Sequence, residues 1–357
     1  MCASNTSAIG LDDPIIEMVP FHVMVKPRGP LCNLACTYCH YRSKEALYPG
    51  SQFLMSREVL AAFTDQYLAT NSGSQVTFTW QGGEPTLAGI PFFRLALELQ
   101  ERYVRPNTHI INALQTNGTL LNDKWGEFLQ RHNFLVGISL DGPPELHNIY
   151  RIDRRGRPSF NAVMRGIKVL KEYKVEFNVL TAIHAKNCSY PLEVYWFLRD
   201  EVGAKYIQFV PIVDRIGGAV APYSVTPRKF GSFLISVFDE WLRHDIGEVY
   251  VQIFEEALAA WAGLPRSLCV FAETCGRCLV LEHNGDLYSC DFYVDSAHRL
   301  GNILQTPLIS LVRSSQQRRF GLAKRTTLPL YCQAVSYTHL RAHETEADLV
   351  CRLLLEK

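Results

Sequence analysis

Short apolar, β-branched segments recur along the first two-thirds of the chain, and most are separated by a segment with helical periodicity. The expected strands are His22–Val25, Val76–Trp80, Ile110–Gln115, Leu135–Leu140, Phe177–Ile183 and Tyr206–Ile212. The expected helices are Arg57–Ala69, Pro91–Tyr103, Asp123–His132, Phe160–Tyr173 and Leu192–Val202. This alternation predicts repeated βα units and a parallel sheet. Since six units are too few for a closed eight-stranded barrel, we expect an α/β fold in the form of a partial (β/α)6 TIM-like barrel.

The pattern changes after Pro222, where two helical segments, Arg228–His244 and Val251–Ala262, precede a segment rich in cysteine. A chain of 357 residues suggests two domains, or one barrel with an appendage. We therefore expect an N-terminal lead over 1–20, the partial barrel over 21–220, a helical connection over 221–265, an extension over 266–334 and a tail over 335–357.

Polar motifs follow four consecutive expected strands. A cysteine-bearing loop follows the first, and the next three end in Gln81-Gly-Gly-Glu-Pro85, Gln115-Thr-Asn-Gly118 and Ser139-Leu-Asp-Gly142. Right-handed crossovers place the carboxyl ends of such strands on one face of a barrel, where active sites are built. A single glycine-rich turn could merely end a strand, but four in series favour one shared site.

Composition and charge exclude several classes of partner. The formal net charge is +1 and the pI is near 7.6, so nothing indicates a nucleic acid or an anionic membrane surface. No apolar run reaches the length of a membrane helix, and the first residues lack the basic-then-apolar order of a signal peptide. We therefore expect a soluble cytoplasmic protein.

Eleven cysteines are many for such a chain, and their odd number argues against a disulfide framework. They form two groups that suggest two metal sites. The first is Cys32-Asn-Leu-Ala-Cys36-Thr-Tyr-Cys39, whose three thiolates can hold three corners of a 4Fe–4S cluster and leave the fourth iron open. A zinc site completed by His40 is the alternative.

This spacing, after a first strand and before Gly82-Gly-Glu84, resembles the radical S-adenosylmethionine (SAM) superfamily. The resemblance implies that Cys32, Cys36 and Cys39 ligate a 4Fe–4S cluster and that its open iron binds SAM, which is split to give a 5′-deoxyadenosyl radical. The residues that it implies for SAM binding are Tyr38, Gly82, Gly83, Glu84, Ser139, Arg151 and Ile212.

Longer motifs narrow the resemblance to the anaerobic sulfatase-maturating enzymes. They are Leu31–Tyr41, Trp80–Leu87, Leu114–Gly118, Ser139–Pro143 with His147–Arg151, and Thr274–Arg277 with Glu282–Asp291. The resemblance implies oxidation of a cysteine or serine in an unfolded sulfatase, within Cys/Ser-x-Pro/Ala-x-Arg, to Cα-formylglycine without oxygen. It also implies an electron donor such as flavodoxin or ferredoxin. A related radical SAM maturase that forms a thioether or carbon crosslink in another peptide is the alternative, and an inert iron–sulfur or zinc scaffold is a second one.

The same resemblance implies roles in substrate chemistry. Asp291 matches the catalytic base, and an anionic cluster beside it should raise its pKa; the alternative is an exposed aspartate in a turn. Gln81 and Tyr41 match residues that face the substrate, although both could instead be packing or hydrogen-bonding residues.

The second cysteine group resembles the start of the family's C-terminal (SPASM) extension, which carries two auxiliary 4Fe–4S clusters. The resemblance implies Cys269, Cys275 and Cys290 as ligands of the first cluster and Cys332 as a ligand of the second. Cys278 has no counterpart, so we expect it, like Cys188, to be a packing residue. We expect Val335–Lys357 not to belong to the natural protein, in which case the auxiliary clusters would lack ligands and be held poorly.

Overall fold

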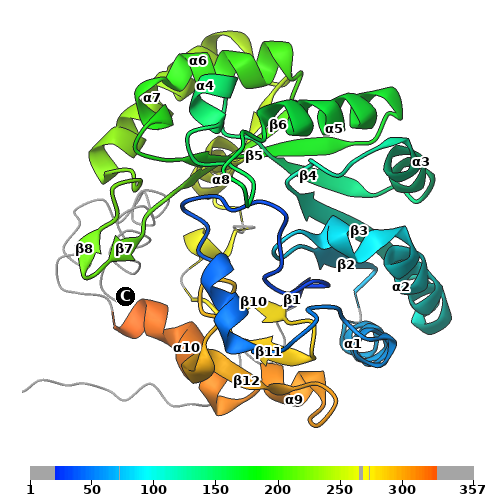
Figure 1. Ribbon diagram of the computed structural model, residues 1–357. Coiled ribbons are helices and arrows are strands. Elements are labelled where there is room, and N and C mark those ends of the chain that lie inside the picture. The colour runs from blue at the N-terminus through cyan, green and yellow to red at the C-terminus, as the bar shows by residue number, and fades with distance from the viewer. Residues whose placement is uncertain (1–20, 72, 265–267, 273, 328–357) are drawn as a thin grey trace, which may run out of the picture.

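The structure is a computed structural model that describes residues 21–71, 73–264, 268–272 and 274–327. Its centre is a ten-stranded sheet in the order β12-β11-β10-β1-β2-β3-β4-β5-β6-β9 (Figure 1). Neighbouring strands are parallel from β10 to β9, whereas β11 runs antiparallel to both of its neighbours, β10 and β12. The strands are β1 (His22–Val25), β2 (Gln75–Trp80), β3 (His109–Thr116), β4 (Leu135–Ser139), β5 (Phe177–Ile183), β6 (Tyr206–Pro211), β9 (Tyr250–Val251), β10 (Cys278–Leu281), β11 (Asp286–Tyr288) and β12 (Arg299–Asn302).

Helices lie outside the curved sheet, and all but the last two, which follow β12, are in the connections between strands (Figure 1). They are α1 (Arg57–Thr70), α2 (Gly89–Tyr103), α3 (Asp123–Arg131), α4 (Pro144–His147), α5 (Phe160–Glu172), α6 (Pro191–Trp196), α7 (Pro227–His244), α8 (Gln252–Trp261), α9 (Leu308–Val312) and α10 (Ser315–Thr326). Shorter helical turns are η2 (Arg42–Leu47), η3 (Pro85–Ala88), η4 (Asn187–Ser189), η5 (Phe197–Glu201), η6 (Cys269–Phe271) and η7 (Ser296–His298). A small hairpin, β7 (Arg215–Ile216) with β8 (Ala219–Val220), is separate from the main sheet.

Local sequence explains where these helices begin and which face they bury. The Ser56 side chain accepts a hydrogen bond from the Val59 backbone N–H and so caps the start of α1. Thr226 caps α7 in the same way, and Pro227 occupies its first turn, where no backbone N–H is needed. In α1 the buried residues recur at helical spacing: Val59, Leu60, Phe63, Thr64, Tyr67 and Leu68.

The predicted α/β fold is confirmed, and all six expected strands are present within a residue or two of their expected bounds. The expected helix Leu192–Val202 is divided into α6 and the π-helical turn η5. The sequence analysis missed β10, β11 and β12, because strands of only three or four residues carry little periodicity. These strands extend the sheet directly from β1, so the cysteine-rich segment and the βα units share one sheet.

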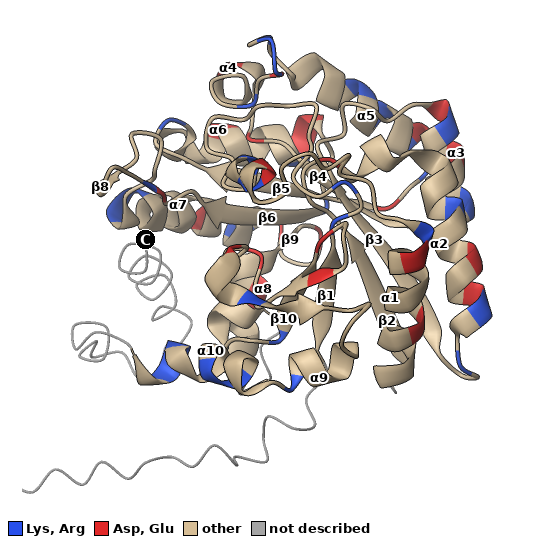
Figure 2. Cartoon of the chain, turned by 60° about the horizontal axis from the view of Figure 1, so that its bottom comes forward, with Lys and Arg blue, Asp and Glu red and all other residues tan. Residues whose placement is uncertain are grey.

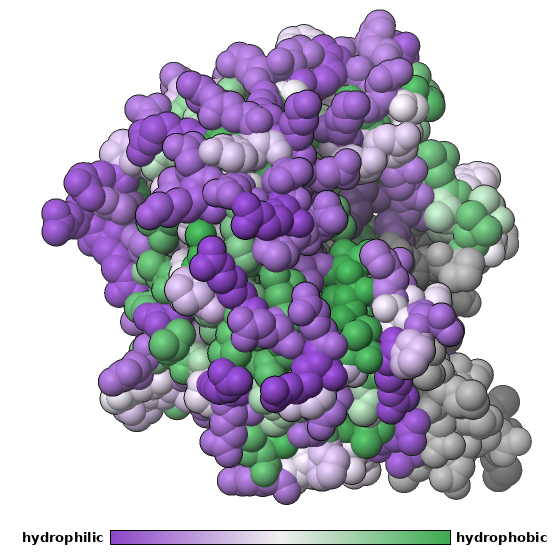
Figure 3. All heavy atoms as spheres, turned by 90° about the vertical axis from the view of Figure 1, so that its right-hand side faces the viewer, coloured by the Kyte–Doolittle hydropathy of each residue, from purple (hydrophilic) through white to green (hydrophobic). Residues whose placement is uncertain are grey.

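The core lies between the sheet and the outer helices, and its largest fully buried side chains include Trp80, Trp241 and Phe93. Charged side chains of both signs are interspersed over the helices (Figure 2). The face shown in Figure 3 is hydrophilic over its upper part, and apolar side chains gather nearer its middle. None of the helices in the described ranges is long and apolar enough to cross a membrane.

Candidate active site

The first cysteine loop leaves the carboxyl end of β1, and its three thiols are all partly exposed. The Leu34 backbone N–H and the Asn117 side-chain amide approach Cys32 Sγ at 3.3 Å and 3.6 Å, and the Cys39 N–H donates to the Cys36 carbonyl at 3.1 Å. Burial and neighbouring negative charge raise the pKa of Cys32 to about 12. Burial also raises the pKa of Cys36 to about 11, although Arg151 opposes it. Such a set of thiols fits an iron–sulfur cluster, because bound iron supplies the positive charge that stabilises thiolates.

The Gly82-Gly83 turn after β2 lies directly against the segment that leads into this loop. A Cβ atom on Gly83 would come within 2.1 Å of the Leu31 carbonyl oxygen, which no real side chain can do. Gly82 has φ +135°, and its Cβ would approach the Gly29 carbonyl oxygen at 2.9 Å. The expected close backbone approach is therefore present between two segments of this chain. The expected contact with SAM stays a prediction.

Glu84 is fully buried and joins three segments of the chain. Its Oε1 accepts from the Thr86 N–H at 3.0 Å and from the Thr116 hydroxyl at 2.6 Å, and its Oε2 accepts from the Asn117 N–H at 2.8 Å. Burial raises the pKa of Glu84 despite these donors. Glu84 thus ties the turn after β2 to the end of β3. Asn117 in turn donates to Asn33 at 2.9 Å, so the tie continues into the cysteine loop.

Tyr38 and Arg151 meet at a buried carboxylate that the sequence analysis did not single out. The Tyr38 hydroxyl donates to Asp141, and Arg151 Nε lies 2.9 Å from the same Asp141 oxygen. Burial alone would raise the pKa of Asp141, but the charge and hydrogen bond of Arg151, together with His147 and His184, hold the pKa below its usual range. Asp141 and His147 belong to motifs that were noted, Ser139–Gly142 and His147–Arg151, but their roles depend on contacts that sequence spacing does not reveal.

The two remaining residues expected at SAM lie at the ends of β4 and β6. The Gln115 side-chain amide donates to the Ser139 hydroxyl at 3.3 Å. The Ile212 N–H donates to the Ile183 carbonyl at 2.8 Å, which continues the pairing of β5 with β6. The structure therefore places the expected SAM residues after successive parallel strands, at the carboxyl ends where barrel active sites are built.

Asp291 forms an ion pair with Lys26, the residue that follows β1, at 2.5 Å. Its side chain is 20% exposed and that of Lys26 is 2% exposed, so the alternative of an aspartate in an exposed turn is wrong. Burial would raise the pKa of Asp291, but Lys26, helped by His40 and Lys44, lowers it below the usual range. Within the chain itself, a buried lysine thus opposes the expected rise, and the effect of a neighbouring cluster on the pKa of Asp291 stays a prediction. Lys26 was missed, and its only signal was a lone charge after an apolar strand.

Lys26 also contacts Tyr41, one of the two residues expected to face the substrate. Its ammonium group lies 4.2 Å from the centre of the Tyr41 ring. Tyr41 is buried and donates its hydroxyl hydrogen to Glu282, and burial raises its pKa well above the usual value. Gln81 is half-buried, and its side-chain amide contacts Met24 of β1. A series of contacts thus leads from Cys39, which packs against the cluster of Tyr41 and Val280, to Asp291.

The second cysteine group is assembled by the strands that the sequence analysis missed. Cys269 lies in η6, Cys275 precedes β10, Cys278 is the first residue of β10, and Cys290 follows β11. All four are partly exposed. Cys278, expected to be a packing residue, donates its thiol hydrogen to Cys269, which lowers the pKa of Cys269 to about 7. Cys188 is buried in the main core, as expected. Cys332 and the tail 335–357 lie outside the described residues.

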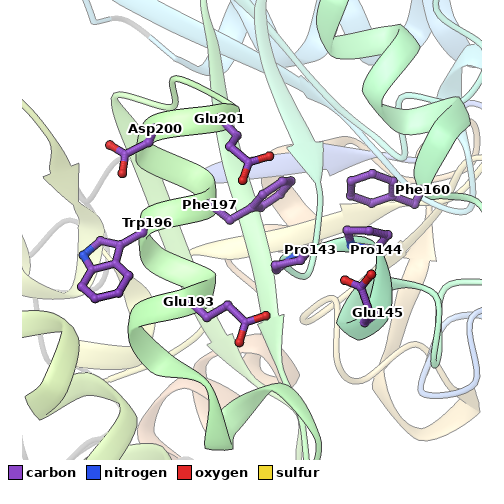
Figure 4. A pocket seen from close by; sticks show the side chains of 9 residues that line it. All are labelled: Pro143, Pro144, Glu145, Phe160, Glu193, Trp196, Phe197, Asp200 and Glu201. Carbon is purple, nitrogen blue, oxygen red and sulfur yellow. The ribbon is translucent and has the colours of Figure 1, made fainter.

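A pocket of about 560 Å³ lies elsewhere, between α4 and the start of α5 on one side and α6 with η5 on the other (Figure 4). It is lined by Pro143, Pro144, Glu145, Phe160, Glu193, Trp196, Phe197, Asp200 and Glu201. None of the expected site residues lines it. Four carboxylates make it acidic, although Arg199 pairs with Asp200 at 2.6 Å.

Comparison with known families identifies two regions of the chain. Residues 27–190 match the Radical SAM superfamily, and residues 269–334 match an iron–sulfur cluster-binding domain, SPASM. The first range contains the Cys32–Cys39 loop and the Gly82-Gly83 turn, and the second contains the four cysteines described above. The donor chemistry of both groups therefore agrees with the matched families.

Two curated proteins and two solved structures resemble the chain over most of its length. A serine-type anaerobic sulfatase-maturating enzyme of Bacteroides thetaiotaomicron is 43% identical over 89% of this chain and 80% of its own. A cysteine-type enzyme of Clostridium perfringens is 36% identical over 85% and 83%. The structure of native anSMEcpe with bound AdoMet and Cp18Cys peptide matches with a TM-score of 0.83 at 33% identity, over 91% of this chain and 88% of that one. Streptococcus suis SuiB bound to precursor peptide SuiA matches with a TM-score of 0.66 at 13% identity, over 92% and 72%, which shows a shared fold alone.

Proposed function

Because this chain belongs to the anaerobic sulfatase-maturating enzymes of the radical SAM superfamily, we propose that it oxidises one cysteine or serine of a sulfatase polypeptide to Cα-formylglycine. The observation that carries the proposal is the series of contacts from the Cys32–Cys39 loop through Tyr41 and Lys26 to Asp291. These contacts link a carboxylate to the loop where we propose that the radical chemistry starts.

Cys32, Cys36 and Cys39 would hold the 4Fe–4S cluster, and the Gly82-Gly83 turn lies beside them for SAM. When bound, these groups supply a carbon-centred radical that takes one hydrogen atom from Cβ of the target residue. The remaining work of the chain is to position the peptide, exclude water and accept a proton. Tyr38, Arg151, Ser139 and Ile212 are the residues we propose for orienting SAM, since they surround the ends of the same parallel strands.

Asp291 is the residue that we propose as the base. Conversion of a CH2–OH group to an aldehyde, or of a CH2–SH group to a thioaldehyde, removes two electrons and two protons in total. One hydrogen atom accounts for one of each, so a base must accept the second proton and an electron acceptor the second electron. Water then hydrolyses the thioaldehyde to the aldehyde and hydrogen sulfide leaves. Lys26 supports this role of Asp291, because its charge keeps the carboxylate ionised and its contact fixes the side chain in place.

The second electron requires an acceptor, and the auxiliary cysteine group fits that task through a bound iron–sulfur cluster. An external donor such as flavodoxin or ferredoxin would supply the electron that starts each cycle. We place the enzyme in the cytoplasm, because clusters of free cysteines are kept reduced there.

Modification of another peptide, by thioether or crosslink formation, is the second candidate. Its support is the shared fold with SuiB, at an identity too low to argue function. The two candidates predict different products from different peptides, so one assay separates them.

The test is an anaerobic assay of the reconstituted protein with SAM, a reductant and either of two peptides, Cys-x-Pro-x-Arg or Ser-x-Pro-x-Arg. A third peptide with alanine at the target position is the control. We expect 5′-deoxyadenosine and a hydrazine-reactive aldehyde from at least one of the first two and no aldehyde from the control. Deoxyadenosine without aldehyde from either peptide would overturn the sulfatase assignment and retain the radical SAM chemistry.

A further inference from the structure

Four cysteines of the extension converge although only three were expected to share a site. The Cys278 thiol donates to Cys269, and Cys278 also interacts electrostatically with Cys275 and Cys290. Cys290 interacts in turn with Cys269 and Cys275. Cys278 therefore contacts Cys269 and lies near the other two thiols.

The sheet register explains this convergence. Strands β10 and β11 pair antiparallel, with Val280 opposite Tyr288. In the same register Cys278, two residues before Val280, comes toward Cys290, two residues after Tyr288. Side chains alternate between the two faces of a strand, which puts Cys278 on the same face as Val280. Val280 packs in the cluster that contains Tyr41 and Tyr288. Parallel pairing of Cys278 with His22 of β1 anchors this position in the main sheet.

Helix α10 holds the backbone around the other cysteines. The Lys324 ammonium group donates to the carbonyls of Cys269, Val270 and Ala272 at 3.1, 2.7 and 2.5 Å. The Gln317 side-chain amide donates to the carbonyls of Gly276 and Ser289 at 3.0 and 3.3 Å.

The Cys275 N–H donates to the Gly321 carbonyl of the same helix at 3.0 Å. A Cβ on Gly321 would lie 2.8 Å from the Cys275 carbonyl oxygen, so the helix approaches as closely as its glycine permits. Fixed backbone of this kind is what a preorganised ligand set requires.

We propose that Cys278 is a ligand of the auxiliary iron–sulfur cluster and completes, with Cys269, Cys275 and Cys290, a set of four thiolates. Four thiolates saturate a 4Fe–4S cluster, so this cluster would have no open iron and would serve electron transfer rather than substrate binding. Each cysteine of such a cluster binds a different iron, whereas zinc requires all four thiolates around one ion, so iron and sulfide analysis separates the two.

The test uses a background in which Cys32, Cys36 and Cys39 are all replaced by alanine, so that only auxiliary iron remains. Iron and sulfide per chain and the EPR spectrum of the reduced protein are measured after anaerobic reconstitution. We expect about four irons in the background and, on adding Cys278→Ala, a loss of about one iron per chain with an altered EPR spectrum, because three thiolates can still hold the other three irons. The matched control is Cys188→Ala, a cysteine of the main core, which should keep the iron of the background.

The Cys278→Ser variant tests whether Cys278→Ala loses iron only because it fails to fold. Serine keeps a small side chain that can still bind iron through oxygen. We expect it to retain iron with an altered EPR spectrum and an unfolding midpoint close to that of the background. Unchanged iron and an unchanged spectrum in both Cys278 variants would overturn the proposal. So would a Cys269–Cys278 disulfide found by peptide mapping of the cluster-loaded protein. Neither outcome depends on aldehyde formation, so the proposal can fail without the proposed function failing.

Discussion

The two cysteine groups lie at opposite ends of the same short strand but are assembled in different ways. The first follows the last residue of β1 and comes from eight consecutive residues, Cys32–Cys39. The second lies beside the first residue of β1, through the pairing of His22 with Cys278, and comes from residues spread over 269–290. The three steps of β1 correspond to about 10 Å of backbone rise between the two ends. A local motif builds the first group, whereas strand register and α10 build the second.

The largest expected effect is that a substitution in one cysteine group removes the function of that group and leaves the other group intact. Cys36→Ala should abolish 5′-deoxyadenosine formation, a decrease of at least about a hundredfold, and leave auxiliary iron in place. Cys290→Ala should do the reverse, with loss of auxiliary iron and retention of SAM cleavage. Iron analysis and deoxyadenosine measurement on both variants check this. Equal loss of both signals in each variant would show that the two groups are not independent.

Replacing Asp291 should impair the oxidation of the peptide without disturbing either cysteine group. Asp291→Asn should decrease aldehyde formation by about 10²- to 10⁴-fold, because the carboxylate that accepts the second proton is lost. Deoxyadenosine should still form. Asp295→Asn is the matched control, since Asp295 caps η7 and has no place in the proposed reaction. An aldehyde yield of Asp291→Asn equal to that of the control would rule out the assigned role.

Gly83→Ala should distort the first group through its close backbone contact. The new Cβ would overlap the Leu31 carbonyl, so we expect destabilisation by about 2 kcal/mol or more and weaker SAM binding. Gly231→Ala is the control, because Gly231 lies inside α7 with no atom near its Cβ position and should stabilise by about 0.5–1 kcal/mol. Urea unfolding and SAM titration measure both effects, and equal stability of the two variants would contradict the contact.

The smallest expected effect concerns two buried histidines near Asp141, His147 and His184. Burial lowers the pKa of His147 to about 3 and that of His184 to about 4, against a usual value near 6.5. At pH values between the lowered pKa of each histidine and 6.5, the unfolded chain binds more protons than the folded chain. The free energy of unfolding therefore falls as the pH is lowered through 6.5. We expect a loss of about 2–4 kcal/mol between pH 7 and pH 5. His147→Gln should halve this loss, whereas His109→Gln, at an exposed site, should not change it. Urea unfolding at both pH values checks this.

The sequence predicts the first group well and the second only in part. The spacing of Cys32, Cys36 and Cys39 is local, and the strand that precedes it has a clear apolar pattern, so loop and site could be predicted together. The sequence did not indicate where Cys278 lies, and we expected it to be a packing residue. Its place depends on the pairing of β10 with β1 and β11. Strands of three or four residues give too little periodicity to predict such a register.

The same limit applies to the contacts of Asp291 and Tyr41. The ion pair of Asp291 with Lys26 joins residues 265 positions apart, and the hydrogen bond of Tyr41 to Glu282 spans 241. Neither could be inferred from spacing along the chain. The direction of the Asp291 pKa shift depends on that one buried lysine, which no motif marked.

The most direct test of the central claim follows the hydrogen atom itself. A Cys-x-Pro-x-Arg or Ser-x-Pro-x-Arg peptide carrying two deuterium atoms on Cβ of the target residue is incubated anaerobically with the reconstituted protein, SAM and reductant. Mass spectrometry of both products is then compared with that from unlabelled peptide. We predict one deuterium in 5′-deoxyadenosine and one in the peptide aldehyde, in equal amounts. Unlabelled deoxyadenosine with both deuterium atoms still on the peptide would contradict oxidation at Cβ by this site.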